Sequence, residues 1–278
     1  MPASSEVDSR QYVITYGIES PKEIPPDFLR QELLEDFQAG LFLPRDQPDW
    51  FGRSRYPPRI LSLVGRALWI DAHPSAKEPC RRIALDELVY MESGHMLLRG
   101  WLRFVTASFE QTVFYSTVFR RTVGRFLRRL RAAWMAPEPP STQPSGEEFE
   151  ETPEVKFRNA LAYELDPDET LRGRMFVAPR EMTWGFLIHR WKSWAPGDLL
   201  LLTPRRLLWI TDRDWGSQAR YGTIARYAPL SRIRSVTWDV RKGGGALRIE
   251  LAAGRRWEIP VPPEHRDAAR WFEDLYAH

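Results

Sequence analysis

The chain has 278 residues, of which 43% are hydrophobic and 28% charged, and its formal net charge is +3. This length predicts two domains, and the composition excludes a wholly disordered chain. The single cysteine, Cys80, excludes an intrachain disulfide and a cysteine-based zinc site, which is typical of a reducing compartment. The N-terminus lacks a signal-peptide pattern, and charges interrupt the aromatic run 101–119, so we expect a cytoplasmic protein, at most peripheral to a membrane.

The first half begins with a polar stretch, residues 1–24, which predicts a flexible arm. Leucines at helical spacing then predict a helix from Asp27, as its N-cap, to Gly40, as its C-terminal stop. Short strands are expected from 41 to 116. A helix with a regular apolar stripe is expected over 117–134.

A stretch rich in proline and glutamate, 136–153, disfavours a packed core and predicts a linker. The expected domains are therefore 25–135 and 154–278. The second half predicts a short helix over 155–165, then strands, with 184–194 as one of them. A closing helix follows Pro262-Pro263.

The two halves repeat each other. Leu68-Trp69-Ile70 matches Leu208-Trp209-Ile210 at an offset of 140 (208 − 68). Leu85 matches Leu230 at an offset of 145 (230 − 85), and the closing helices match at that same offset. The five extra residues of the second copy are expected between Ile210 and Leu230. A constant spacing across strands, turns and helix indicates a duplicated unit.

The second copy resembles a bacterial pleckstrin-homology-like (PH-like) or GRAM-like domain. The resemblance is carried by the hairpin from Leu199 to Thr211, with its Thr203-Pro204 turn, and by the segment from Tyr227 to Val236. It implies an α+β, mainly β fold of two PH-like units. Each would be a curled antiparallel sheet or open barrel of about seven strands closed by a C-terminal helix. The first copy departs from this pattern, because Val64-Gly65 replaces Thr203-Pro204.

The sequence holds no pattern of catalytic or metal-ligating residues. There is no H-E-x-x-H, no G-x-S-x-G and no phosphate loop, and the glycines 243–245 lead into a strand rather than a helix. We therefore expect a non-enzymatic protein with no cofactor and no metal site; an enzyme of an unrecognised type is the remaining alternative.

Two groups of residues are candidate binding sites. The helix over 117–134 carries arginines away from its apolar stripe, where anionic lipid, a nucleic acid backbone, the acidic linker residues 147–151 or solvent are alternative partners. The second group is an aromatic strand and a nearby loop, which suit a protein interface, a membrane interface or packing between the copies. The candidate residues are Arg120, Arg121, Arg125, Arg128, Arg129 and Arg131, then Arg190, Trp191, Trp194 and Trp215.

These features favour a binding or scaffold protein whose ligand is another protein. The alternative is a peripheral protein that binds anionic lipid through the arginine helix and exposed tryptophans. The stretches that correspond to pleckstrin-type lipid loops, Pro44-Arg45-Asp46 and Pro179-Arg180-Glu181, each place an acid beside the arginine, which argues against a phosphoinositide ligand. A net charge of only +3 does not suggest nucleic acid.

Overall fold

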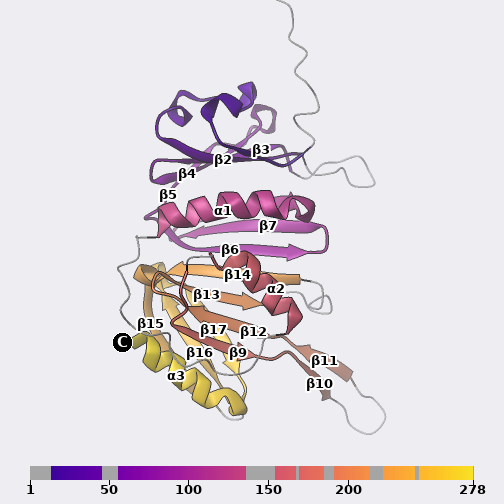
Figure 1. Cartoon of the computed structure of the whole chain (residues 1–278), viewed down its shortest axis with the longest axis vertical. Helices are drawn as coiled ribbons and strands as arrows, with labels where there is room; N and C mark the ends of the chain where they lie inside the picture. The colour runs from indigo at the N-terminus through magenta and orange to yellow at the C-terminus, as the bar shows by residue number, and fades with distance from the viewer. Residues whose placement is uncertain are drawn as a thin grey trace, which may run out of the picture. The chain divides into compact units, whose positions relative to one another are not determined.

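The fold is mainly β, with several antiparallel sheets and three α-helices among the described residues, and none of these sheets closes into a barrel. The computed structural model describes residues 14–45, 56–135, 154–166, 169–184, 191–212, 222–241 and 244–277 (Figure 1). The chain forms two compact units. Unit 1 comprises 1–87, 98–100 and 113–134, and unit 2 comprises 88–97, 101–112 and 135–278. Unit 2 therefore takes in part of the first repeat. The expected linker, 136–153, lies outside the described residues.

Unit 1 is built on a five-stranded antiparallel sheet in the order β1-β2-β3-β4-β5. Its long helix, α1 (Arg120–Trp134), packs against β1 and β2 and buries the stripe that the sequence predicted. The strands are β1 (Tyr16–Ile18), β2 (Phe37–Leu43), β3 (Arg59–Val64), β4 (Ala67–Ala72) and β5 (Arg81–Ala84).

The helix predicted from Asp27 to Gly40 is wrong. The segment forms 3₁₀ turns at Pro26–Phe28 and Gln31–Leu33, and Gly40 lies inside strand β2. The leucine spacing was misleading because Leu29 and Leu34 are about half exposed, whereas Phe28 and Leu33 are buried. The described end of the expected flexible arm is also ordered, since β1 pairs with β2.

The 3₁₀ turns cover one face of the unit 1 sheet, and α1 lies on the other (Figure 1). Ile24, Phe28 and Leu33 form one apolar cluster with Ile18, Phe42 and Ile60 of strands β1, β2 and β3. The sheet is thus buried on both faces, which explains why β3 is apolar at successive positions rather than alternating.

Unit 2 contains a long antiparallel sheet in which strands of both sequence repeats are joined. The order is β8-β7-β6-β14-β13-β12-β9, with β8 entering unit 1 at Val113. Strand β6 of the first repeat pairs with β14 of the second, from Gly222↔Met96 to Tyr227↔Met91. The strands are β6 (Leu88–Met96), β7 (Arg99–Thr106), β8 (Glu110–Ser116), β9 (Gly173–Val177), β12 (Asp198–Leu202), β13 (Arg206–Thr211) and β14 (Gly222–Pro229).

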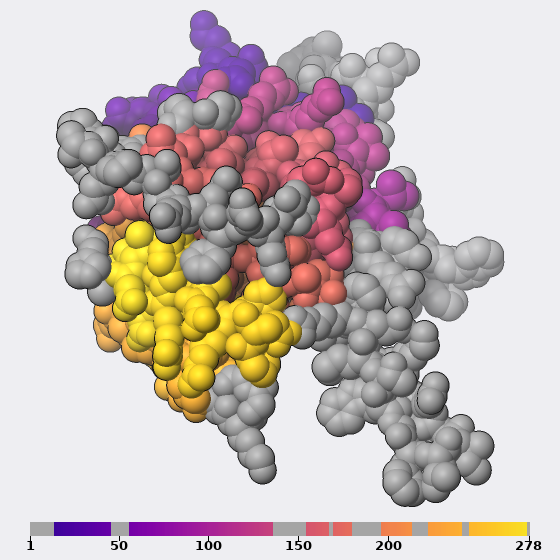
Figure 2. Space-filling view, turned by 60° about the horizontal axis from the view of Figure 1, so that its bottom comes forward, coloured from indigo at the N-terminus to yellow at the C-terminus, as the bar shows by residue number. Residues whose placement is uncertain are grey.

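A second sheet and a helix complete the core of unit 2. Strands β15 (Ile233–Arg241), β16 (Gly244–Leu251) and β17 (Arg256–Val261) form an antiparallel meander. Helix α3 (Arg266–Ala277) packs against β15, β16 and β9, and it lies at the surface in the space-filling view, where its residues are yellow (Figure 2). Phe272 of α3 is fully buried in a cluster with Leu200 of β12 and Leu247 of β16.

Helix α2 (Val155–Glu164) packs on β13 and β14 of unit 2, and Phe157 anchors it in the interior. Leu199, Leu201, Leu208 and Ile210 alternate with the residues of the main core cluster, yet each has no exposed surface. The most apolar stretch of the sequence is therefore a hairpin buried on both faces.

The structure retains the repeat at the level of whole elements. Strand β15 begins 145 residues after β6 (88 to 233), and β16 ends 145 residues after β7 (106 to 251). One hydrogen bond is also repeated: Leu85 N donates to Arg66 O at 2.9 Å, and Leu230 N donates to Arg205 O at 3.0 Å. Arg66 therefore corresponds to Arg205, an offset of 139 (205 − 66).

The offset of 140 inferred from the Leu-Trp-Ile match is thus wrong by one residue. A slip of one residue moves every side chain of a strand to the opposite face. Trp69 packs against the cluster under the 3₁₀ turns, whereas Trp209 lies in the main core of unit 2. The second copy accordingly has six extra residues (145 − 139) between its hairpin and β14, rather than five.

The aromatic stretch expected as one strand over 184–194 belongs instead to two strands of a hairpin. Strands β10 (Arg180–Trp184) and β11 (Trp191–Ala195) pair antiparallel, with Trp184 opposite Trp191 and Glu181 opposite Trp194. Periodicity alone did not separate the two strands, because the aromatic residues run from Trp184 at the end of β10 to Trp191 and Trp194 in β11.

Candidate functional site

Helix α1 presents an arginine face. Arg121, Arg125 and Arg128 follow one another at spacings of four and three residues, so they lie on one side of the helix, and all three are exposed. None of them is paired with an acid among the described residues. We call these three residues the arginine face.

The other three predicted arginines of α1 are placed differently, which corrects the sequence-based expectation. Arg131 is buried, with 2% of its surface exposed, because it lies one turn after the buried Leu127 on the same side of the helix. Arg120 is half-buried. Arg129 is engaged within unit 1, since it forms an ion pair with Glu19 at 2.5 Å and donates to the carbonyl of Gln38 at 3.3 Å.

The structure tests few of the remaining predicted site residues. Trp191 and Trp194 are placed in β11 through its backbone pairing with β10. Arg190, Trp215 and the acidic residues 147–151 lie outside the described residues.

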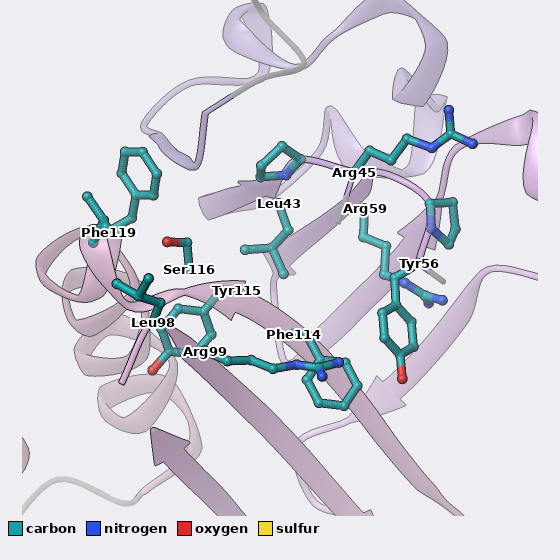
Figure 3. A pocket seen from close by; sticks show the side chains of 13 residues that line it. Leu43, Arg45, Tyr56, Arg59, Leu98, Arg99, Phe114, Tyr115, Ser116 and Phe119 are labelled. Atoms are coloured by element: carbon teal, nitrogen blue, oxygen red, sulfur yellow. The ribbon is translucent and has the colours of Figure 1, made fainter. Parts of the chain in front are cut away.

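Unit 1 also contains a pocket of about 440 Å³ that the sequence analysis did not identify (Figure 3). Cationic and aromatic side chains line it together, and none of its described lining residues is acidic. The lining comprises Leu43, Pro44, Arg45, Tyr56, Pro57, Arg59, Leu98, Arg99, Phe114, Tyr115, Ser116, Val118 and Phe119.

Four segments of unit 1 bring these side chains together. Arg45 follows β2, Arg59 begins β3, Arg99 begins β7 and Phe114 lies in β8. Val118 belongs to the 3₁₀ turn that leads into α1, so the pocket lies beside the start of that helix.

The floor of the pocket depends on a glycine. Tyr115 is buried with 6% of its surface exposed, and its ring lies where a Cβ on Gly100 would stand, at 2.3 Å. Any larger residue at position 100 would displace the ring.

The guanidinium of Arg99 lies over two rings. Its carbon is 4.3 Å from the centre of the Phe114 ring and 5.8 Å from that of Tyr56, and the two rings are 4.6 Å apart. This contact is a cation–π interaction, which fixes the guanidinium without neutralising it. Arg59 is partly neutralised, because it forms an ion pair with Glu78 at 2.6 Å. Arg45 is exposed, and neither Arg45 nor Arg99 is paired with an acid among the described residues.

Sequence reasoning considered Arg45 only within its own loop, beside Asp46. It missed Arg99, Tyr56 and Phe114 because they come from segments far apart in the chain. The sequence feature that could have indicated this pocket is Leu98-Arg99-Gly100, in which an arginine stands between an apolar residue and a glycine. The structure shows that Leu98 is exposed.

The arrangement can bind anions, but it holds no ready set of metal ligands. Among the described residues, no group of three or more His, Cys, Asp or Glu side chains could hold a metal ion. Within the same part of the chain, no helix is both long and apolar enough to cross a membrane. No protein-family model matches the sequence, and neither does any curated protein.

Proposed function

We propose that each repeat is a PH-like unit. Support comes from the order of elements in the second repeat: β9, β12, β13 and β14 form one antiparallel layer, the meander β15–β17 a second, and α3 closes the core. The first repeat has the same succession along the chain, from β2–β5 through β6–β8 to α1. Folds of this kind present surfaces for binding, so we infer a non-enzymatic binding protein.

The proposed ligand is an anionic membrane surface, and the arginine face is its contact. The observation that carries this proposal is the difference between the two closing helices. Helix α1 has six arginines and no acidic residue. Helix α3 has Arg266 and Arg270 at the positions of Arg121 and Arg125, but also three acidic residues, Asp267, Glu273 and Asp274. Only α1 can act as a uniformly cationic surface.

Exposed aliphatic side chains beside the start of α1 favour a membrane over a nucleic acid. Val118 is 72% exposed and Leu98 is 74% exposed. Apolar side chains next to arginines suit an interface with headgroups and acyl chains, whereas a phosphate backbone offers them no partner.

A protein partner is the second candidate. The expectation rested on Trp191, Trp194, Arg190 and Trp215, and no described side-chain contact bears on any of them. A protein ligand would be bound largely by apolar contacts, so its affinity would depend less on salt than that of an anionic membrane.

Co-sedimentation of the full chain with vesicles tests the membrane proposal. We expect binding to vesicles that contain anionic lipid at low salt, and weaker binding at high salt. Each arginine near such a surface contributes about 1 kcal/mol, so the double variant Arg121→Gln/Arg125→Gln should bind roughly 30-fold more weakly.

The repeat supplies the matched control, Arg266→Gln/Arg270→Gln on α3, which should bind as the unchanged chain does. Equal binding to neutral and anionic vesicles would contradict the proposal, and so would equal losses for the two double variants. No vesicle binding at low salt would leave the protein-partner proposal as the better one.

A further inference from the structure

The pocket of unit 1 combines positive charge with an apolar lining, and this combination restricts its ligand. Of its three arginines, Arg59 already has Glu78 as a partner, so the charge available to a ligand comes from Arg45 and Arg99. Two arginines that have no acidic partner among the described residues would attract an anionic group, and the planar guanidinium can donate two parallel hydrogen bonds to a carboxylate or a phosphate.

Arg99 is held ready for such a contact. The guanidinium carbon lies over the rings of Phe114 and Tyr56, and its N–H groups form no hydrogen bond with another described residue. The side chain therefore loses little further freedom when it binds an anion, which favours affinity.

Most of the pocket lining is aromatic or aliphatic, so it makes no favourable contact with a small inorganic anion. Phe114, Tyr115 and Phe119 provide aromatic surface (Figure 3). Leu98 and Val118 also line the pocket, and most of their own surface is exposed. Covering this surface with an alkyl chain would release about 25 cal/mol for each Å² of apolar area removed from water. A cavity of about 440 Å³ is within the range of small-molecule sites.

We propose that this pocket binds a single-chain anionic amphiphile, in which one carboxylate or phosphate head is carried on one alkyl chain. The head meets Arg99, and the chain lies along the aromatic lining toward Leu98 and Val118, while Arg45, whose side chain extends away from Arg99, adds positive charge at longer range (Figure 3). The proposal does not depend on the arginine face, because a dissolved amphiphile monomer can enter the pocket without a membrane.

Calorimetric titration of the full chain tests this with four probes: dodecanoate and dodecyl phosphate below their micelle concentrations, dodecanol below its solubility limit, and inorganic phosphate. We expect one-to-one binding of the first two, and binding at least tenfold weaker for dodecanol and for inorganic phosphate. The comparison of dodecanoate with dodecyl phosphate then identifies which head group the arginines prefer.

Arg99→Gln should weaken binding of the preferred amphiphile at least tenfold, because it removes the charge and the paired donors. The control is Arg82→Gln, which removes another exposed arginine of unit 1 that lies over a ring, Trp69 at 5.9 Å, outside the pocket. Three results would overturn the proposal: affinity for inorganic phosphate or dodecanol equal to that for the amphiphiles, binding of many amphiphiles with loss of the thermal unfolding transition, or equal affinities of the two variants.

Discussion

A chain cut to residues 136–278 should fail to fold as a stable monomer, although it contains the whole second repeat. Strand β14 is hydrogen-bonded along its outer edge to β6, through six residue pairs from Gly222↔Met96 to Tyr227↔Met91. The cut removes β6 and leaves that edge bare. Exposed edges of this kind pair with other chains, so the fragment should also associate.

The loss extends from the edge into the core of unit 2. Val89 of β6 belongs to the main apolar cluster, and the ring of Tyr90 packs edge-on against Trp257 at 5.5 Å. Glu92 is buried and holds the side chain of Arg226 at 2.8 Å. At about 0.5–1.5 kcal/mol for each backbone hydrogen bond, the edge alone approaches the roughly 5–15 kcal/mol that stabilises a typical domain.

Size-exclusion chromatography and urea unfolding, followed by tryptophan fluorescence, would compare the fragment with the full chain. A peptide of residues 86–112, which carries the β6–β7 hairpin, should restore a cooperative transition when it is added to the fragment. A monomeric fragment that unfolds at the midpoint of the full chain without the peptide would contradict the prediction.

This pairing also shows what the sequence could and could not establish. The two amphipathic helices follow from local periodicity, which is visible in one stretch of chain at a time, and the duplication follows from the constant offset of 145 between the two halves. The pairing of β6 with β14 joins residues that lie between 126 (222 − 96) and 136 (227 − 91) positions apart, and no local pattern marks it. A mainly β fold was predictable, but the partner of each edge strand was not.

The sites show the same limit. The exposure of Arg121, Arg125 and Arg128 follows from helical spacing. The burial of Arg131 follows from the same spacing, because Arg131 lies one turn after the buried Leu127. The pocket has no such signal, because Arg99 and Tyr56 are brought together only by the fold.

The substitution Arg206→Met should destabilise unit 2 by about 3–5 kcal/mol, the usual result of removing one partner of a buried ion pair. Arg206 has no exposed surface. Its Nε donates to Glu169 at 2.8 Å, a second nitrogen pairs with the other carboxylate oxygen, and it also donates to the carbonyl of Glu164 at 2.9 Å. Methionine fills similar space but leaves the Glu169 carboxylate, 6% exposed, without its cation.

The position of Glu164 adds to this effect. It is the last residue of α2, and its carboxylate accepts a hydrogen bond from the hydroxyl of Tyr227, over whose ring Arg206 lies at 5.3 Å. Arg206 thus connects the C-terminal end of α2 to the sheet. Its loss should therefore also weaken the packing of α2 on β13 and β14.

Thermal unfolding would measure the difference, with a fall in Tm of roughly 10 °C expected for a unit of this size. Arg256→Met is the matched control, because Arg256 is an exposed arginine at the start of strand β17 and should change stability little. The double variant Arg206→Met/Glu169→Gln should be more stable than Arg206→Met alone, since the uncompensated charge is then removed as well. If Arg206→Met proves as mild as Arg256→Met, the ion pair does not hold α2, and the burial of Phe157 must fix the helix by itself.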